Sequence, residues 1–303
     1  MPAAHAFTRR HAVLLVVLTL VWGLNWPVMK LGVTGFAPLT FRALSMWGGL
    51  PLLAAALWWL KVPFRVPRAH WRELALLAVT NMIVWHVLAI VAVQSLSSGR
   101  AAILGYTMPI FSALWGTALF GQRLQPRNWL GVAAAALGVA LLLWHEFGRL
   151  SGKPWAALAM LFAACVWALG TQQLRRTRMP LPLLTIAFWM TALTAAVMTL
   201  ASVLFERTQW AAPTPVVWAA IAYNAVGVFG FAQPAWFYLA RTLPPVASTL
   251  SVMMIPVLGV FAGALVLGEV LHWQDFTAVA LMVLAILTVL LPSRQTLATA
   301  RSA

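Results

Sequence analysis

Long runs of apolar residues alternate with short polar segments along almost the whole chain. A helix needs about 20 mostly apolar residues to cross the hydrocarbon core of a bilayer. Ten runs are long and apolar enough to predict membrane-spanning helices, and the connections are too short to hold a separate domain. The predicted spans cover residues 12–33, 36–60, 72–95, 97–120, 127–145, 154–173, 181–205, 215–240, 243–268 and 273–292. The predicted fold class is an all-α integral membrane protein with ten transmembrane helices.

The composition agrees with this pattern and excludes several classes of protein. Of the 303 residues, 63% are apolar and 8% are charged, and the mean hydropathy is +0.90. A soluble domain carries about 25% charged residues, and a water-soluble globule cannot bury this much apolar surface. A soluble enzyme, a disordered chain and a secreted disulfide scaffold are excluded, the last because Cys165 has no second cysteine to pair with.

Positive charge predicts the orientation of the chain. The 20 Lys and Arg residues, which dominate a net charge of +15, lie in short clusters between the apolar runs rather than on one basic face, so we expect no nucleic-acid partner. If the N-terminus is cytoplasmic, most of them fall in inner loops. The basic residues that then fall outside are Lys30, Arg100, Arg149, Lys153 and Arg207, together with the acids Glu146, Glu206, Glu269 and Asp275. The positive-inside rule therefore predicts cytoplasmic N- and C-termini.

The two halves of the chain resemble each other. An offset of 147 residues aligns Pro109 with Pro256. It also aligns two small-x-x-x-small patterns, which let membrane helices pack closely. These patterns are Ser112 with Gly116 and Gly259 with Gly263. An offset of 145 residues aligns Trp22 with Trp167. We predict two repeats of five spans each, residues 12–145 and 154–292.

Five is an odd number, so the second repeat must cross the membrane in the opposite sense to the first. The predicted architecture is an inverted repeat about a pseudo-two-fold axis in the membrane plane. This arrangement is typical of secondary transporters, which bind the substrate near the midplane between the halves and expose it alternately to the two sides.

A mid-span proline, a small-x-x-x-small step and a glycine before a short loop recur in each half, the glycines being Gly121 and Gly268. Ten spans with these motifs resemble the drug/metabolite transporter superfamily and, within it, the EamA-type exporters. Over nearly the whole chain the sequence is similar to the YddG-type aromatic amino-acid exporters. The resemblance implies a multi-pass exporter of the bacterial inner membrane. Many members carry an acid where the fourth span of a half ends; Gln122 stands there in the first half and Glu269 in the second.

Prolines inside spans mark candidate hinges or helix breaks. Proline removes a helical hydrogen bond, and paired interruptions in the two halves point to a transporter site. Pro109 and Pro256 form such a pair, and Pro27 is a further predicted break without an evident partner. The alternative for each is a packing kink that neighbouring helices tolerate.

Polar side chains in the middle of spans are costly and therefore informative. Asn25, His86, Tyr106 and Gln233 are predicted to contact substrate. Each could instead form an interhelical hydrogen bond, which for Gln233 and for Asn224 is the stronger alternative. His86 could equally be a buried histidine with protein partners, and no histidine or cysteine at ligand spacing accompanies it, so no metal site is expected.

Two basic residues lie inside the predicted outer ends of spans. Arg42 is six residues inside the second span, and we expect its side chain to extend outward to the surface; the alternative is that it holds a substrate carboxylate. Lys30 is nearer the surface, where extension outward is easier.

Tryptophans within the spans predict the chemistry of the substrate. Trp22, Trp26 and Trp167 are the candidates for substrate contact, because flat aromatic walls favour stacking with aromatic solutes. The alternative is that some deep tryptophans face lipid. No Asp or Glu lies in the middle of a predicted span, and ion-coupled carriers usually need such a carboxylate. We therefore expect a neutral or zwitterionic solute.

These observations predict an exporter of aromatic and other hydrophobic amino acids that works by alternating access. The alternative is an exporter of lipophilic drugs or other neutral metabolites. A channel would need rings of polar groups along a wet path, and a membrane enzyme would need paired acids, histidine clusters or a nucleophile motif; neither pattern is present. We expect no catalytic residues and no cofactor. The expected partners are a small-molecule substrate and membrane lipid, and the oligomeric state is open, a monomer included.

Overall fold

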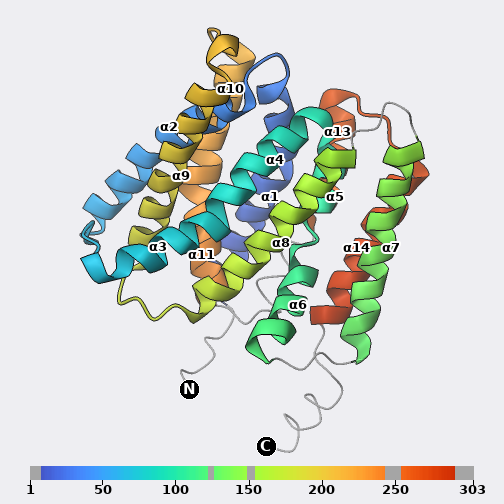
Figure 1. Ribbon diagram of the computed structural model, residues 1–303, viewed down its shortest axis with the longest axis horizontal. Helices are drawn as coiled ribbons and strands as arrows, with labels where there is room; N and C mark the ends of the chain where they lie inside the picture. The colour runs from blue at the N-terminus through green and yellow to red at the C-terminus, as the bar shows by residue number, and fades with distance from the viewer. Residues whose placement is uncertain (1–7, 122–125, 149–153, 243–253, 291–303) are drawn as a thin grey trace, which may run out of the picture.

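The chain forms a bundle of helices. The computed structural model describes residues 8–121, 126–148, 154–242 and 254–290, and within these ranges it contains no β-strand. Figure 1 shows the helices lying alongside one another, with α7 and α14 together at one edge. The helices are α1 (Arg9–Val33), α2 (Pro38–Trp59), η1 (Arg68–His70), α3 (Trp71–Ala78), η2 (Val79–Ile83), α4 (Val84–Ser95), α5 (Ser98–Gly105), α6 (Met108–Phe120), α7 (Pro126–Gly148), α8 (Pro154–Arg176), α9 (Leu183–Phe205), η3 (Arg207–Gln209), α10 (Pro215–Tyr223), η4 (Asn224–Ala232), α11 (Gln233–Thr242), α13 (Met254–Leu267) and α14 (Trp273–Leu290).

Helical stretches of membrane-spanning length account for much of this bundle. Seven are long and apolar enough to cross a bilayer, and shorter apolar helices accompany them, among them α13 and part of α14. The seven are His11–Val33, Pro38–Trp59, Arg68–Ser95, Ser98–Phe120, Pro154–Arg176, Leu183–Phe205 and Pro215–Ala240. The predicted all-helical membrane class is confirmed. The count of ten and the side of the termini stay predictions, because the predicted spans 243–268 and 273–292 extend beyond the described residues.

Local sequence accounts for where several helices begin and end. Proline occupies one of the first two positions of α2, α6 and α10, where its missing N–H costs no helical bond. Gly121 follows α6 with φ of 64°, and Gly268 follows α13 with φ of 65°. A residue with a side chain is strained at such angles. The two glycines that align in the repeat thus end corresponding helices in the same way.

Two spans contain a π-helical segment. The segment η2 lies between α3 and α4, and η4 lies between α10 and α11. The repeat offset of 147 residues carries all of η2 onto residues within η4. Because π-helical turns are rare and cluster at functional sites, their matching positions indicate that both halves use the same irregular backbone.

The helices pack in a pattern expected if a two-fold axis relates the two repeats. Corresponding spans pack on each other: α2 on α9, α5 on α13 and α7 on α14. Other contacts are also matched, since α1 packs on α13 and η4 while α8 packs on their counterparts α6 and η2. A two-fold relation between the repeats predicts this pattern.

Small residues sit where these helices come closest. A Cβ on Gly259 would lie 2.7 Å from Ala102 Cβ and 3.1 Å from Trp26 Cδ1, so Gly259 allows α13 to approach α5 and α1. A Cβ on Gly263 would collide with Ser98 and Glu269 in the same way. In the first half, Ser112 accepts hydrogen bonds from Gln172 Nε2 through both its carbonyl and hydroxyl oxygens, and Gly116 is buried.

One predicted helix break is not seen. The helix α1 continues through Pro27 to Val33, so Pro27 does not interrupt it. The break in the fourth span lies between α5 and α6, immediately before Pro109, which is one of the first residues of α6. Pro256 is the third residue of α13, and the chain before Met254 lies outside the described residues.

We predict that Gly259→Ala destabilises the protein and that Gly138→Ala does not. The first adds a methyl group to a filled contact, which costs about 1–3 kcal/mol. At Gly138 the nearest atom to an added Cβ is Leu281 Cβ at 3.5 Å, an ordinary contact, and alanine favours helix over glycine by about 1 kcal/mol. Thermal unfolding of the purified proteins in detergent measures the difference. A Gly259→Ala variant as stable as the Gly138→Ala control would contradict this account of the packing.

Candidate functional site

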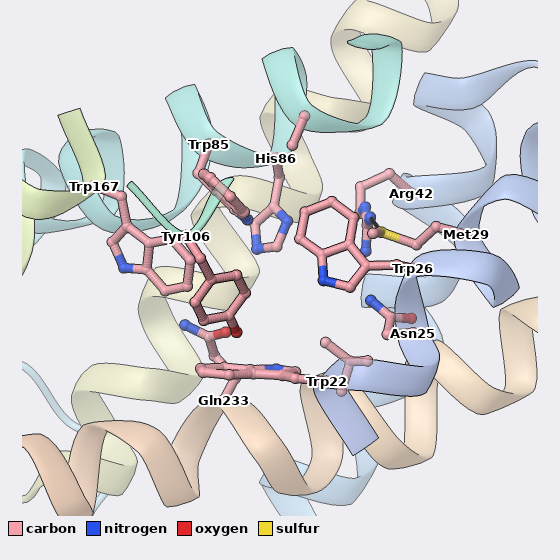
Figure 2. Close-up of a pocket in the computed structure, with 12 residues that line it drawn as sticks. Trp22, Asn25, Trp26, Met29, Arg42, Trp85, His86, Tyr106, Trp167 and Gln233 are labelled. Atoms are coloured by element: carbon pink, nitrogen blue, oxygen red, sulfur yellow. Dashed lines mark hydrogen bonds between the residues drawn. The ribbon is translucent and has the colours of Figure 1, made fainter. Parts of the chain in front are cut away.

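A cavity lies between the two halves and is lined mostly by aromatic and apolar side chains (Figure 2). It encloses about 470 Å³ of space not filled by protein atoms, part of which is open to solvent. All seven residues predicted to contact substrate line it, namely Trp22, Asn25, Trp26, His86, Tyr106, Trp167 and Gln233. The other lining residues are Met29, Arg42, Trp85, Ala89 and Val228. The structure brings the predicted set together; that these residues bind substrate stays a prediction.

Helical spacing explains the contribution of α1. Trp22, Asn25, Trp26 and Met29 are separated by three, one and three residues and therefore share one face of the helix. The opposite face of α1 carries exposed side chains such as Val16 and Leu20. Met29 was not among the predicted residues, although the same spacing would have included it.

The irregular segments place the remaining side chains. Trp85 and His86 lie in the first turn of α4, which follows η2, and Gln233 follows directly after η4. The repeat offset of 147 residues carries His86 onto Gln233, so the two halves present polar groups from corresponding positions. Tyr106 lies in the break between α5 and α6, where Thr107 Oγ1 donates a 2.7 Å hydrogen bond to the carbonyl of Leu104.

The tryptophan rings form a connected wall. Trp22 meets Trp167 with ring centroids 6.0 Å apart and an interplanar angle of 77°, and Trp167 meets Trp85 at 4.6 Å. Trp85 in turn lies 6.4 Å from Trp26 in an edge-to-face arrangement. These are the distances at which aromatic pairs attract. The two tryptophans that align in the repeat therefore meet across the boundary between the halves.

One glycine keeps this wall close to the backbone. A Cβ on Gly105 would lie 2.9 Å from the Trp85 ring and 3.1 Å from the Trp26 ring. Any side chain here would push the two indoles apart and reshape the cavity. A position within a span does not by itself place a tryptophan in the cavity. Trp47 also lies within a span, but it is 49% exposed and does not line the cavity.

Polar atoms in the cavity wall lack protein partners. Within the described part of the chain, six buried polar atoms of five lining residues form no hydrogen bond. They are Asn25 Oδ1, Arg42 Nε, His86 Nδ1, His86 Nε2, Trp167 Nε1 and Gln233 Nε2. Buried polar groups are normally paired, so a cluster of such atoms around one cavity is a feature of a site that binds water or a polar ligand.

The prediction that the Arg42 side chain extends outward was wrong. Arg42 is 1% exposed, lines the cavity and donates a 3.0 Å hydrogen bond from Nη1 to Asn224 Oδ1. Lys30 is half-buried, and its Nζ donates to the carbonyls of Val93, Gln94 and Leu96 at the end of α4. Arg42 thus meets a protein acceptor in the interior, whereas Lys30 bonds to a helix end.

An interhelical hydrogen bond was the stronger expectation for both Asn224 and Gln233, but the described structure shows one for Asn224 alone among these two. Asn224 makes the expected interhelical bond to Arg42 and also donates from Nδ2 to the carbonyl of Ala220 at 3.0 Å. Gln233 instead presents its Nε2 to the cavity with no partner among the described residues. Within those residues, no three His, Cys, Asp or Glu side chains gather closely enough to hold a metal ion.

The sequence model of the EamA-like transporter family matches the chain twice, at residues 10–144 and 154–291. The chain belongs to the EamA-like transporter family. Its relatives include the "Uncharacterized inner membrane transporter YedA" of Escherichia coli strain K12, which is 30% identical over 289 residues, or 91% of this chain and 89% of the relative. The "Probable terminal-alkyne amino-acid exporter" of Streptantibioticus cattleyicolor is 26% identical over 269 residues, or 86% of each chain.

The fold is shared with a solved protein. A solved chain described as "Crystal structure of protein" superposes with a TM-score of 0.67 at 22% identity, over 95% of the present chain and 98% of that one. The protein is thus a membrane transporter of the EamA-like family, and the names of its relatives indicate transport rather than catalysis.

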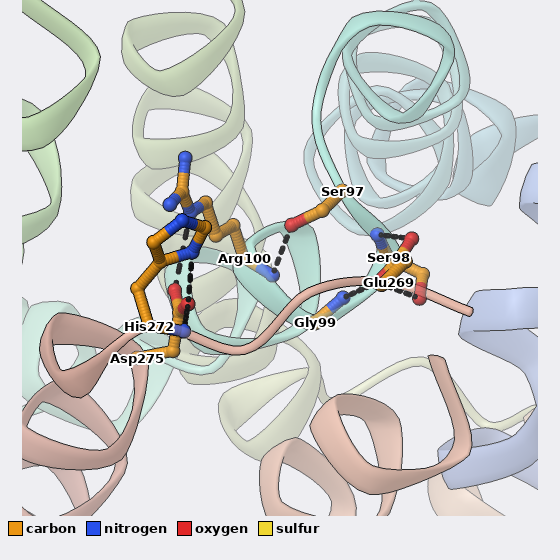
Figure 3. A network of polar contacts seen from close by, with 7 residues as sticks. All are labelled: Ser97, Ser98, Gly99, Arg100, Glu269, His272 and Asp275. Atoms are coloured by element: carbon orange, nitrogen blue, oxygen red, sulfur yellow. Dashed lines mark hydrogen bonds and ion pairs between the residues drawn. The ribbon is translucent and has the colours of Figure 1, made fainter. Parts of the chain in front are cut away.

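Acidic residues join the two halves of this EamA-like transporter away from the cavity (Figure 3). Glu269, which follows α13, accepts hydrogen bonds from Ser98 N at 2.7 Å, Ser98 Oγ at 2.9 Å and Gly99 N at 3.3 Å. It thereby caps the start of α5, where backbone N–H groups have no helical acceptor. Asp275 of α14 forms an ion pair with Arg100 of α5, with 3.1 Å between Asp275 Oδ1 and Arg100 Nε.

Glu206 plays the same part for another helix. Its Oε1 accepts from Leu39 N at 2.8 Å and its Oε2 from Thr40 N at 2.7 Å, at the start of α2. In both cases a carboxylate from the second repeat caps a helix of the first. The family's acidic position at Glu269 therefore has a structural role in this chain, and its counterpart Gln122 lies outside the described residues.

We predict that Glu269→Ala lowers stability more than Glu73→Ala does. The first removes a charged cap from α5, an interaction of about 1–2 kcal/mol. Glu73 is exposed and accepts one hydrogen bond, from Thr177 Oγ1, so its loss costs little. Thermal unfolding in detergent is the measurement, and equal shifts of the two midpoints would rule out the cap as a significant contact.

Proposed function

We propose that this protein exports aromatic and other hydrophobic amino acids across the bacterial inner membrane by alternating access. The observation that carries the proposal is the cavity, in which a wall of tryptophans faces a set of polar groups without protein partners in the described structure. An aromatic amino acid has a flat apolar ring and a small polar end, so it complements both parts.

The relatives support the membrane and the substrate class. One relative is named an inner membrane transporter, and another is named a probable amino-acid exporter. The positive-inside distribution of Lys and Arg supports cytoplasmic termini. Termini on one side require an even number of spans, which agrees with ten spans in two inverted repeats of residues 12–145 and 154–292. The matched packing of corresponding helices supports the same architecture.

Alternating access would use the contacts between the halves as one of two gates. The caps from Glu206 and Glu269 and the Arg100–Asp275 pair join the halves at the end predicted to face outside. Opening the cavity toward that end requires these contacts to separate. The break at Tyr106 and the π-helical segments η2 and η4 provide backbone that can adjust without disrupting long helices.

A second substrate class fits the apolar part of the cavity. Lipophilic drugs or other neutral metabolites would contact the tryptophan wall, and water molecules would bond to the unpaired polar groups. Uptake into proteoliposomes of labelled amino acids and of a neutral aromatic drug, with and without a pH or sodium gradient, separates the two classes. Saturable transport and counterflow of amino acids support the proposal, whereas drug uptake that amino acids do not inhibit favours the second class.

We predict that Trp167→Ala weakens transport of phenylalanine and tryptophan about two- to tenfold more than transport of leucine. An aromatic pair contributes about 0.5–1.5 kcal/mol beyond simple burial, and only the aromatic solutes lose it. The measurement is the concentration dependence of uptake into proteoliposomes.

Trp58→Ala is the matched control for this prediction. Trp58 is the residue before the last of α2, is 75% exposed and is not among the residues that line the cavity. Its replacement should leave the ratio of aromatic to aliphatic transport unchanged. Equal losses for leucine and phenylalanine in Trp167→Ala would reject stacking on this wall.

A further inference from the structure

Arg42 is the residue of the cavity that the proposed function leaves unexplained. Among the described residues that line the cavity, it alone carries a fixed charge. Its side chain is 1% exposed. Burying a charge is costly unless an opposite charge or several hydrogen bonds compensate it.

The protein compensates Arg42 only in part. A guanidinium has five N–H donors. Nη1 donates to the amide oxygen of Asn224, and Nη2 contacts the sulfur of Met29. Nε has no acceptor within the described structure. An amide and a thioether are neutral, so the positive charge is held in place without being neutralised.

Aromatic rings fix the position of this charge. The guanidinium carbon lies 5.6 Å from the centre of the Phe229 ring and 5.9 Å from that of Phe41, distances at which a cation attracts a ring face. His86 packs on the same Phe229 ring, at 5.3 Å between centroids. Phe229 therefore holds Arg42 and His86 next to each other.

Arg42 and His86 both present unused hydrogen-bonding groups to the cavity. Neither ring nitrogen of His86 has a protein partner in the described ranges, and the residue is 4% exposed. Figure 2 shows Arg42, His86 and Asn25 around one side of the cavity, with Trp167 and Gln233 on the other. One side thus carries the positive charge of Arg42, and the other carries the Trp167 ring and the amide of Gln233.

We infer that Arg42, with His86, binds the carboxylate of the transported solute, and that the substrate class is aromatic carboxylates, whether or not they carry an amino group. The inference rests on the proposed function, and it extends the expected neutral or zwitterionic solutes to anionic aromatic carboxylates. A guanidinium matches a carboxylate in charge and geometry. No Asp or Glu is found among the described lining residues, so the site supplies a partner for the negative end of the solute and no opposite charge for an ammonium.

Three solutes with the same phenyl ring test the inference on the unchanged protein. They are 3-phenylpropionate, which has only the carboxylate, L-phenylalanine, which has both charges, and 2-phenylethylamine, which has only the ammonium. Binding is measured by calorimetry on purified protein and transport by counterflow in proteoliposomes. We expect 3-phenylpropionate to bind at least as tightly as phenylalanine, and 2-phenylethylamine about tenfold or more weakly, since hydrogen bonds to a charged group contribute tenfold or more in affinity.

The variant Arg42→Gln separates recognition from packing. Glutamine retains an amide donor for Asn224 and removes the charge. Binding of 3-phenylpropionate should fall about tenfold or more, while binding of the neutral analogue 3-phenylpropionamide should change less than about twofold. Arg207→Gln, at an exposed residue between α9 and α10, is the control and should change neither. Thermal unfolding checks that Arg42→Gln is folded; the comparison of the three solutes does not depend on it.

Two results overturn the inference and leave the proposed function standing. One is that the unchanged protein transports phenylalanine but binds 2-phenylethylamine as tightly as 3-phenylpropionate. The other is that Arg42→Gln weakens the amide and the carboxylate equally, which would make Arg42 a packing residue. If the unchanged protein neither binds nor transports any of these aromatic solutes, the proposed function fails and the inference fails with it.

Discussion

A polar group inside a membrane protein has no bulk water to bond with, so it must find a partner in the protein, in a buried water or in a solute. This constraint separates the polar residues of the transporter into two kinds. Thr80, Thr185 and Thr194 donate to nearby side-chain or carbonyl oxygens. Asn25, His86 and Gln233 present atoms that the described protein leaves unpaired. Six such atoms belong to residues that line one cavity, and this concentration marks the candidate site.

The aromatic side chains solve a related problem. A solute that moves from water into the protein loses its contacts with water. Flat aromatic rings replace them with van der Waals contacts for apolar solutes of many shapes. The wall includes Trp22, Trp26, Trp85 and Trp167, and Gly105 leaves room for the Trp26 and Trp85 indoles beside the backbone. A mostly apolar wall discriminates weakly between similar solutes, by about 1–3 kcal/mol per methylene. Specificity then depends on the few polar groups opposite it.

The two repeats meet in different ways at different depths. Near the cavity they meet through rings, Trp22 on Trp167, and toward one end they meet through carboxylates that cap helices of the other repeat. Ring contacts have little directional preference and can slide, whereas a capped helix end is either bonded or open. In the proposed alternating access, the ring contacts would adapt around the solute and the capped helix ends would separate as a unit.

Much of the fold and of the cavity was predictable, because the membrane imposes simple rules on sequence. Apolar length predicts spans, and most predicted boundaries agree with the helices within a few residues. Polar or aromatic side chains inside those spans are rare and costly, which is why Asn25, His86 and Trp167 could be selected before their positions were known. The glycines that end α6 and α13 were also recognisable, because a left-handed turn favours glycine wherever it occurs.

Other features depended on neighbours that are distant in sequence. Arg42 is long enough to reach either the surface or the interior, and only the position of Asn224 and Phe229 turned it inward. Pro27 remained within a continuous helix, while the fourth span broke just before Pro109. The sequence by itself determined which segments are helical, membrane-spanning and repeated, since those properties follow from local polarity and spacing. The tertiary structure decided where each long side chain points and which partner it meets, since that depends on the helices packed around it.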